Sequence, residues 1–522
     1  MKHSTPILIL TAALASVPML AQNAPPAANP CAGNSGLGAW SAKPSWNGWG
    51  AGITNARFQD AAGAQLAPQQ VSRLKLKWAF GFPGAKAVYG QPTVVAGRVF
   101  LGVDTGTVYS IDAASGCSYW SYQASGPVRS AISIGPGRTT GEDLAYFGDL
   151  KGNVYALNAS TGEQVWKMQA DTHPAAKITG APQLYQNRLY VPVASDEEPL
   201  AVDPTYRCCT FRGSVVALDA FTGRQVWKTY VIPQAPKATG KNAKGTQQFG
   251  PSGGGVWNSP TLDPMRHALY VGTGDAYTAP AAKTTDSILA LDMDSGKVLW
   301  SVQDLAGDAW VVSCIEGRGT PENCPKDHGP DFDFGASPIL RTLPNGKTIL
   351  VAPQKSGIIW GHDPDRKGAV VWKTSLASKQ PGPQGQVNFG GSADERNAYF
   401  GLDSGGIVAL SFNNGERLWF TDIQPESGRH TGHDAAVSTI PGVLFSGGWD
   451  GVLRALATGD GKILWTFDML RDFDTVNGVP AKGGSMGSSG PTIAGGMVFA
   501  GAGYPGVQNG QNGNVLLAFA AE

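Results

Sequence analysis

The stretch GNVYALNASTGEQVW (Gly152–Trp166) decides the fold class, because close and looser copies of it return along the chain. Each copy contains an apolar strand, a turn built on Asp or Asn with Gly, and a short second strand that ends at Trp. The other copies end at Trp120, Trp227, Trp300, Trp372, Trp419 and Trp465. A unit that returns about every 40–50 residues, with strand periodicity and no helical period, is typical of β-propeller blades.

The two ends of the chain predict how the ring of blades closes. Leu74–Phe82 (LKLKWAFGF) and Asn514–Ala520 (NVLLAFA) both have the composition of strands. An open ring would leave unpaired strand edges, so we expect these two segments to share one blade. The Trp-terminated copies and the shared blade together predict an all-β, eight-bladed β-propeller, with seven blades as the alternative.

The start of the chain predicts export. A basic residue (Lys2) precedes an apolar run (Ile7–Leu20), and small residues follow, as in a secretory signal peptide. The run is too short to predict a membrane span, although an uncleaved anchor is the alternative. We therefore assign 1–21 to a signal peptide, 22–45 to a Pro/Ala/Asn-rich leader and 46–522 to a single propeller domain. The mature chain is expected to be periplasmic or secreted, with no membrane span.

Export favours disulfides, because an even number of cysteines in an oxidising compartment usually pairs. The six cysteines are Cys31, Cys117, Cys208, Cys209, Cys314 and Cys324. The last two bracket a polar loop and predict a local disulfide. The adjacent Cys208 and Cys209 favour a vicinal disulfide, although each could pair with one of the first two instead. The chain contains no C-x-x-C-H motif, so we expect no covalently attached haem.

The charge balance and the uneven repeats narrow the functional classes. There are 40 Lys and Arg residues and 40 Asp and Glu residues, so nothing favours binding to nucleic acid. Insertions lengthen successive repeats, and long loops in a compact repeat fold are usually functional. Because they belong to successive blades, we expect them to gather over one mouth of the ring: Ala194–Phe211, Tyr230–Gly255, Tyr277–Thr285 and Ala306–Phe334.

Three carboxylates lie at strand ends in this part of the chain. Glu198 belongs to VPVASDEEP, Asp275 follows VGTG, and Asp286 opens the next strand. Carboxylates from neighbouring blades can converge near the axis and hold a hard cation such as Ca²⁺ through oxygen ligands. The alternative for each one alone is a turn-forming role.

A second set of residues suits an anionic, planar ligand. Arg129, Thr179 and Lys355 lie at loop or strand-start positions of separate repeats and offer cationic and hydroxyl donors for carboxylates. Trp257 lies in the Gly-rich run SGGGVWNSP, where a flat indole could support an aromatic cofactor. Its alternative role is packing between blades.

These motifs together resemble those of pyrroloquinoline quinone (PQQ)-dependent alcohol dehydrogenases, closest to the polyvinyl-alcohol dehydrogenase group. The resemblance extends from about Trp46 to the C-terminus. It is carried by ITGAP (Ile178–Pro182), VPVASDEEP, RCCTFRGSVVALD (Arg207–Asp219), GTGD (Gly272–Asp275), TTDSILALD (Thr284–Asp292), DFDFGASPIL (Asp331–Leu340) and the ending GNVLLAF.

The resemblance implies a role for each candidate. Arg129 matches the arginine that contacts a PQQ carboxylate, and Thr179 matches the threonine of the ITGAP motif. Trp257 matches the tryptophan on which the quinone rests, and Lys355 the basic residue beside its reactive carbonyl. The metal ligands implied are Glu198 and Asp275, the latter at a position where methanol-type enzymes carry asparagine.

The sequence departs from the family pattern at two places. Cys208 and Cys209, the candidate lid over the cofactor, come one blade later than the adjacent cysteines of the family. The GDNxW stretch with the catalytic aspartate is absent, so Asp286 is the nearest candidate base, with Asp275 as the alternative. The residue two positions beyond Asp286 is Ile288, not aspartate, which favours Ca²⁺ over a lanthanide.

The implied protein is an exported quinoprotein dehydrogenase. It would oxidise secondary alcohols, with polymers such as polyvinyl alcohol among the candidate substrates, to ketones by hydride transfer to PQQ, with a divalent metal as Lewis acid. Without haem, its electrons would pass to a separate cytochrome c. The alternatives are a PQQ dehydrogenase for a small primary alcohol or a sugar, and a non-catalytic exported propeller scaffold.

Overall fold

The computed structural model describes residues 29–33, 36–38, 43–376, 386–424, 428–506 and 510–522. The predicted signal peptide lies outside the described residues, as does part of the predicted leader. No helix among the described residues has both the length and the apolar composition needed to cross a bilayer.

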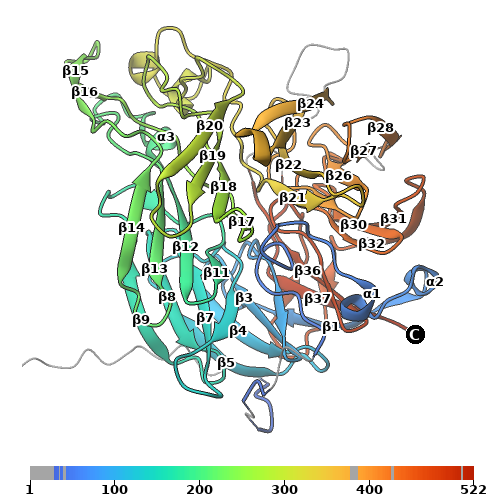
Figure 1. The fold of residues 1–522 in the computed structure, drawn as a ribbon. Coiled ribbons are helices and arrows are strands. Elements are labelled where there is room, and N and C mark those ends of the chain that lie inside the picture. Colours follow the sequence, from blue (N-terminus) through green and yellow to red (C-terminus); the bar gives the residue numbers. More distant parts are fainter. Residues whose placement is uncertain (1–28, 34–35, 39–42, 377–385, 425–427, 507–509) are drawn as a thin grey trace, which may run out of the picture.

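Eight antiparallel sheets form the ring of a β-propeller, which confirms the predicted blade number (Figure 1). The first four blades along the chain consist of β2 to β5 (Thr93–Val95, Arg98–Gly102, Thr107–Asp112, Ser118–Gln123), β6 to β9 (Ser133–Pro136, Asp143–Gly148, Asn153–Asn158, Gln164–Gln169), β11 to β14 (Gln183–Tyr185, Arg188–Ser195, Ser214–Asp219, Gln225–Tyr230) with β10 (Ala176–Lys177) beside β12, and β17 to β20 (Thr261–Asp263, Ala268–Gly272, Ser287–Asp292, Val298–Gln303). The next three consist of β21 to β24 (Ile339–Thr342, Thr348–Pro353, Ile358–Asp363, Ala369–Ser375), β25 to β28 (Ser392–Ala393, Asn397–Gly401, Ile407–Ser411, Arg417–Thr421) and β29 to β32 (Ser438–Ile440, Val443–Gly447, Val452–Ala457, Ile463–Asp468).

The eighth blade closes the ring as predicted, because it takes strands from both ends of the chain. Its order is β35 (Thr492–Ala494), β36 (Met497–Ala502), β37 (Val515–Ala521) and β1 (Leu74–Gly81), and β1 pairs antiparallel with β37. Outside the blades lie two hairpins, β15 with β16 (Lys237–Lys241, Gln247–Gly250) and β33 with β34 (Asp472–Phe473, Ala481–Lys482). The short helices are α1 (Ala61–Ala64), α2 (Pro68–Val71), α3 (Glu197–Leu200), η2 (Val312–Cys314), η3 (Pro321–Asn323) and η4 (Pro364–Arg366).

The Trp and Gly of the repeated phrase join each blade to the next. The indole N–H of Trp166 donates to the carbonyl of Ala220 in the following blade at 2.9 Å. A Cβ at Gly223, in the turn of that blade, would lie 2.7 Å from the Trp166 ring, so only glycine fits there. At the junction that closes the ring, the indole of Trp465 donates to the carbonyl of Leu74 at 3.0 Å. The repeat therefore encodes contacts between blades as well as the blades themselves.

A segment before the first blade, Trp46–Gln59, follows the inside of the ring. Among the described residues it is hydrogen-bonded to the first strand of every blade except the one that starts with β11. Arg57, which is 1% exposed, holds this segment in place. Its guanidinium donates to the carbonyls of Val437 (2.8 Å) and Trp49 (2.7 Å), and it lies 4.7 Å from the centre of the Trp49 ring. The segment thereby fixes Trp49 close to the axis.

Candidate functional site

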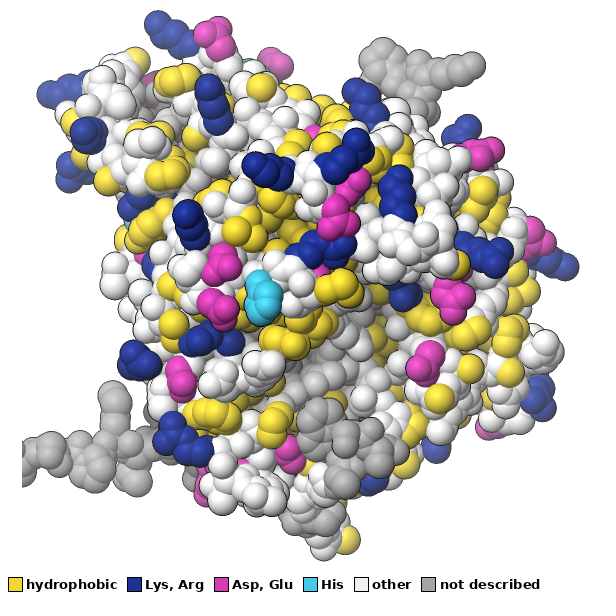
Figure 2. Space-filling model, viewed as in Figure 1, with side chains coloured by type: hydrophobic (Ala, Val, Ile, Leu, Met, Phe, Trp, Pro, Cys, Tyr) yellow, Lys and Arg dark blue, Asp and Glu magenta, His cyan; other side chains and the backbone are white. Residues whose placement is uncertain are grey.

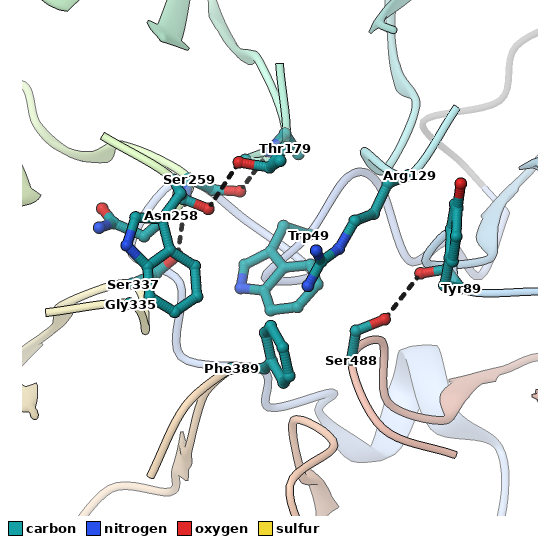
Figure 3. A pocket seen from close by; sticks show the side chains of 13 residues that line it. Trp49, Tyr89, Arg129, Thr179, Asn258, Ser259, Gly335, Ser337, Phe389 and Ser488 are labelled. Atoms are coloured by element: carbon teal, nitrogen blue, oxygen red, sulfur yellow. Dashed lines mark hydrogen bonds between the residues drawn. The ribbon is translucent and has the colours of Figure 1, made fainter. Parts of the chain in front are cut away.

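A cavity, here called the axial cavity, lies where the loops before the first strands of the blades meet (Figure 3). It contains Arg129, Thr179 and Trp257, which the sequence places in three different repeats. Its full lining is Trp49, Tyr89, Arg129, Thr179, Gly180, Ala181, Trp257, Asn258, Ser259, Gly335, Ser337, Phe389 and Ser488. The structure therefore brings together three of the predicted cofactor-binding residues.

One register position accounts for much of this lining. Residues four positions before the first strand of their blade face the axis: Tyr89, Arg129, Thr179, Trp257, Gly335 and Ser488. In the two remaining blades that position is held by Asn388 and Asp434, and the Asn388 amide donates to Asp434 at 2.6 Å. The repeat thus delivers one residue per blade to the axis, and the chemistry depends on which residue stands there.

Arg129 is available to bind an anion. Its guanidinium lies 4.8 Å from the centre of the Phe389 ring and 5.8 Å from that of Tyr504. Among the described residues, no carboxylate lies within ion-pair distance of it. A guanidinium held over aromatic faces without a counter-charge is suited to a carboxylate ligand.

Trp257 is fixed as a flat surface on the cavity wall. Its indole N–H donates to Asp333 Oδ2 at 3.0 Å, and its backbone carbonyl accepts a bond from the Thr179 hydroxyl at 3.4 Å. The ring packs so closely on Gly335 that any Cβ there would overlap it. Lys355 Nζ lies 5.7 Å from the ring centre.

Next to Trp257 lies a group of three carboxylates, here called the carboxylate triad: Glu198, Asp275 and Asp333. One oxygen of each lies within 4.8 Å of the others. Both oxygens of Asp275 are buried without a hydrogen-bond partner among the described residues. Burial, followed by the charges of Asp333 and Asp331, raises the pKa of Glu198 to about 8, and burial and neighbouring carboxylates raise that of Asp275 well above its ordinary value. The oxygen donor set, with both Asp275 oxygens unpaired among the described residues, fits a hard divalent cation.

Lys355 is the ammonium beside the triad. Its Nζ lies 2.6 Å from Asp331 Oδ1 and 3.8 Å from Asp333 Oδ2. Burial alone would lower the pKa of Lys355, but Asp333, Asp331 and Glu198 together raise it well above its ordinary value. The ammonium is therefore charged at neutral pH.

Asp286, the predicted base, does not join the triad. It precedes β19, is 0% exposed, and neither of its oxygens has a hydrogen-bond partner among the described residues. Burial, followed by the charges of Asp333 and Asp308, raises its pKa to about 10. Burial and the neighbouring carboxylates thus favour the neutral form of this carboxyl, which disfavours Asp286 as the base.

The structure contains three disulfides, Cys31–Cys117, Cys208–Cys209 and Cys314–Cys324, so the vicinal and the local disulfide are both confirmed. Cys208–Cys209 does not line the axial cavity. Cys208 instead lines a second cavity with Tyr277 and Phe249.

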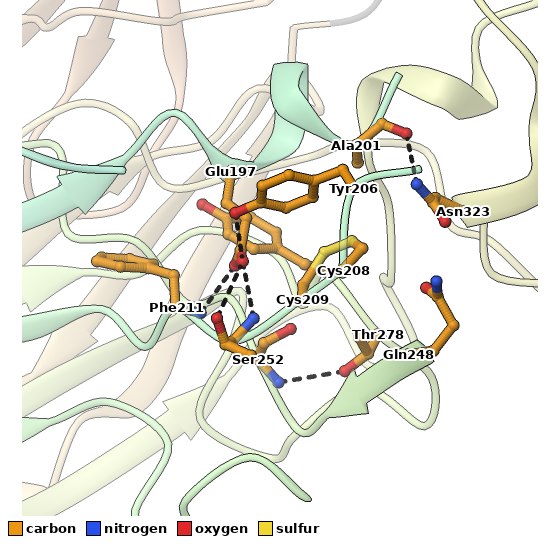
Figure 4. The surroundings of a disulfide bond; sticks show 12 residues. Glu197, Ala201, Tyr206, Cys208, Cys209, Phe211, Gln248, Ser252, Thr278 and Asn323 are labelled. Carbon is orange, nitrogen blue, oxygen red and sulfur yellow. Dashed lines mark hydrogen bonds between the residues drawn. A yellow bond between two sulfur atoms is a disulfide. The ribbon is translucent and has the colours of Figure 1, made fainter. Parts of the chain in front are cut away.

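The vicinal disulfide is anchored by the other glutamate of VPVASDEEP (Figure 4). Glu197 accepts backbone N–H bonds from Thr210 and Phe211, both at 2.8 Å, and a hydroxyl bond from Tyr206 at 3.1 Å. Both of its oxygens are thus used in holding the loop that carries the two cysteines. The adjacent Glu198 is left for the triad.

Asp333, Trp49, Tyr89 and Phe389 belong to the site but were not predicted. Asp333 could have been found, because it stands in the motif DFDFGASPIL just before β21, close to the register position of Arg129 and Trp257 in their blades. Phe389 directly follows Asn388, at the register position of its blade, whereas Trp49 comes from the segment before the first blade and has no such signal.

Curated relatives of this chain show its family. Two curated relatives are named polyvinylalcohol dehydrogenase, one from Pseudomonas sp and one from Sphingopyxis sp. (strain 113P3). Each is 39% identical to this chain, and the alignments cover 91% of this chain and 77% and 76% of the two relatives, respectively. The chain belongs to the PQQ-dependent alcohol dehydrogenase family, in its polyvinyl-alcohol dehydrogenase group. It is therefore an oxidoreductase, as the motifs predicted.

The other comparisons concern the propeller. A family model described as outer membrane protein assembly factor BamB matches residues 56–246 and 403–522, and one described as glucose/ethanol/alcohol dehydrogenase, beta-propeller domain, matches residues 199–312. The solved quinohemoprotein alcohol dehydrogenase from Comamonas testosteroni superposes with a TM-score of 0.67 at 18% identity, over 93% of this chain and 82% of its own. A europium-containing methanol dehydrogenase superposes with 0.64 at 19% identity, over 92% and 99%. At this identity these structures show the fold alone.

Proposed function

We propose that this member of the family oxidises secondary alcohols, including polymeric ones such as polyvinyl alcohol, to ketones. The relatives of highest identity described above are named for that substrate. The single observation that supports a redox site in this chain is the carboxylate triad beside the Trp257 indole. A non-catalytic scaffold needs the blades but gains nothing from three adjacent carboxylates, two buried and Glu198 partly buried, which cost stability unless a cation joins them.

The chain's own residues fit a cation and a carboxylated planar cofactor. Glu198 and Asp275 would hold Ca²⁺ through oxygen ligands, with the Asp333 carboxylate beside them. Arg129 and Thr179 would bind carboxylates of PQQ, and the Trp257 face would support its ring system. When bound, PQQ supplies the hydride acceptor, and the cation polarises its reactive carbonyl.

Asp333 is the base that the geometry favours. Its carboxylate accepts the Asp275 backbone N–H at 2.7 Å and the Trp257 indole N–H at 3.0 Å, so its orientation is fixed. It would take the hydroxyl proton of the alcohol as the hydride leaves the same carbon. Lys355, charged and 3.8 Å away, would stabilise negative charge that develops beside it. Asp286, whose neutral form burial favours, is not a member of this group.

Export and a separate electron acceptor complete the proposal. Three disulfides suit an oxidising compartment outside the cytoplasm, as the N-terminal sequence predicts. Because the sequence lacks a C-x-x-C-H motif, the electrons would leave to a separate haem protein such as a cytochrome c.

The test is reconstitution of the purified chain with PQQ and Ca²⁺. We expect absorbance beyond the protein band and, with an artificial electron acceptor, faster oxidation of secondary and polymeric alcohols than of primary alcohols or sugars. Preference for a primary alcohol or a sugar would replace the substrate class. Failure to bind PQQ at all would favour the scaffold.

A further inference from the structure

The second cavity, here called the hairpin cleft, lies over the vicinal disulfide and has a volume of about 440 Å³. Its walls are not blades. One wall is the β15–β16 hairpin, which projects from the ring at the upper left of Figure 1, and the other is the segment Pro321–Lys326. A cleft of this size is in the range of roughly 300–1,000 Å³ that holds extended organic ligands. A small alcohol at the triad would leave it unused.

The two walls are joined to each other, so the cleft is already formed. The Asn242 amide of the hairpin donates to the Asn323 side-chain carbonyl at 2.9 Å. The Asn323 amide in turn donates to the carbonyls of Ala201 at 3.0 Å and Asp203 at 2.9 Å, just after α3. The disulfide between Cys314 and Cys324 constrains the second wall at Cys324. A ligand would therefore meet fixed walls and lose less entropy on binding.

The cleft begins close to the carboxylate triad. Tyr277 and Thr278 line it, and they are the second and third residues after Asp275 of the triad. Three residues span at most about 11 Å between Cα atoms, which bounds the distance from Asp275 to Thr278. The Tyr277 hydroxyl also lies 3.2 Å from that of Ser195, just before Glu198. A chain that lies in the cleft is thus within a few repeat units of the triad.

The lining combines uncharged hydrogen-bonding groups and apolar surface with three charged side chains, Lys241, Glu322 and Lys326. Thr239 and Gln248 face the cleft beside Phe249 and Pro321. Within the described part of the chain, neither the Thr239 hydroxyl nor the Gln248 side-chain carbonyl has a hydrogen-bond partner. An aliphatic chain with a hydroxyl on alternate carbons offers both kinds of contact. The charged residues of the lining carry both signs. At the upper left of Figure 2, where the hairpin projects, Lys and Arg side chains predominate over Asp and Glu.

We propose that the hairpin cleft binds the chain of a polymeric secondary alcohol beside the unit that is oxidised. This inference rests on the proposed function, because it names where that substrate is held. It predicts that the cleft contributes to affinity for the polymer and contributes nothing to a short diol that fits at the triad alone.

The test compares polyvinyl alcohol with 2,4-pentanediol on the PQQ- and Ca²⁺-loaded enzyme. In the double variant Thr239→Ala/Gln248→Ala, two hydrogen bonds to the polymer are lost, so its KM should rise about tenfold while kcat is unchanged. Both constants for 2,4-pentanediol should stay within about twofold. Lys237→Ala, on the same exposed strand but outside the cleft lining, is the matched control and should change nothing.

Calorimetric binding of polyvinyl alcohol to the cofactor-free protein separates the two proposals. If no secondary alcohol is oxidised but the double variant still weakens polymer binding, the proposed function falls and the cleft stands. If the polymer is oxidised and the double variant changes neither its KM nor its binding, or raises KM for both substrates equally, the cleft is refuted.

Discussion

Replacing each of two buried aspartates by asparagine tests the assignment of the base. At pH 7 an acid with a pKa of about 10 is ionised in about one molecule in a thousand, so Asp286→Asn replaces a neutral acid by a neutral amide of the same shape. We expect kcat to stay within about threefold of the parent enzyme. Asp333→Asn removes a group that can accept a proton and should lower kcat by about 10²–10⁴-fold.

The structure also sets the secondary cost of Asp333→Asn. Asparagine has one side-chain acceptor oxygen, so it can accept from only one of the two donors, the Trp257 indole or the Asp275 backbone N–H. The other donor would face the asparagine NH₂ group and lose its hydrogen bond. The loss of one such bond costs about 0.5–1.5 kcal/mol, too little to unfold the protein.

The assay is steady-state oxidation of a secondary alcohol with an artificial electron acceptor. PQQ content, read from absorbance, normalises the rates, so that weaker loading is not mistaken for slower chemistry. A drop of about 10²-fold or more in Asp286→Asn, with Asp333→Asn still active, would refute the reasoning, because it would make the protonated acid the base.

Three further predictions address the cation, the pH dependence of folding and the junctions between blades. Glu198→Gln should weaken Ca²⁺ binding about 10–100-fold by calorimetry, and an affinity equal to that of the parent protein would contradict the triad. Burial, followed by the charge of Arg454, lowers the pKa of His433 to about 3, so only the unfolded chain takes up this proton as the pH falls below about 6.5. Stability should fall by about 2 kcal/mol between pH 7 and pH 5, and His433→Gln should remove that part of the slope in urea titrations; an unchanged slope would exclude His433. Trp166→Phe should destabilise the protein by about 1–2 kcal/mol more than Trp372→Phe, because the indole N–H of Trp372 has no partner among the described residues whereas that of Trp166 has one. Equal losses of the free energy of unfolding in urea would show that the indole hydrogen bond is not the cause.

The axial residues show how far sequence reasoning reaches. Arg129, Thr179 and Trp257 could be identified because each lies at one register position of a recognisable repeat. Asp275 and Glu198 could be paired as ligands because their strands belong to neighbouring blades. Asp286 lies in the same neighbourhood of the sequence, yet its side chain is buried apart from the triad while that of Asp333 joins it. Both aspartates precede a strand. The spacing of the repeats does not determine the direction in which a side chain at such a position points.

The sequence alone determined the propeller, the blade number, the shared closing blade and the two disulfides between nearby cysteines. These depend on local turns, on strand alternation and on a Trp–Gly contact that every repeat carries. Only the tertiary structure decided which carboxylates meet, that the vicinal disulfide faces a separate cleft, and that Trp49 and Phe389 reach the axis. The reason is physical: a repeat fixes which position of each blade faces the centre, whereas burial and the charges around a side chain depend on residues hundreds of positions away.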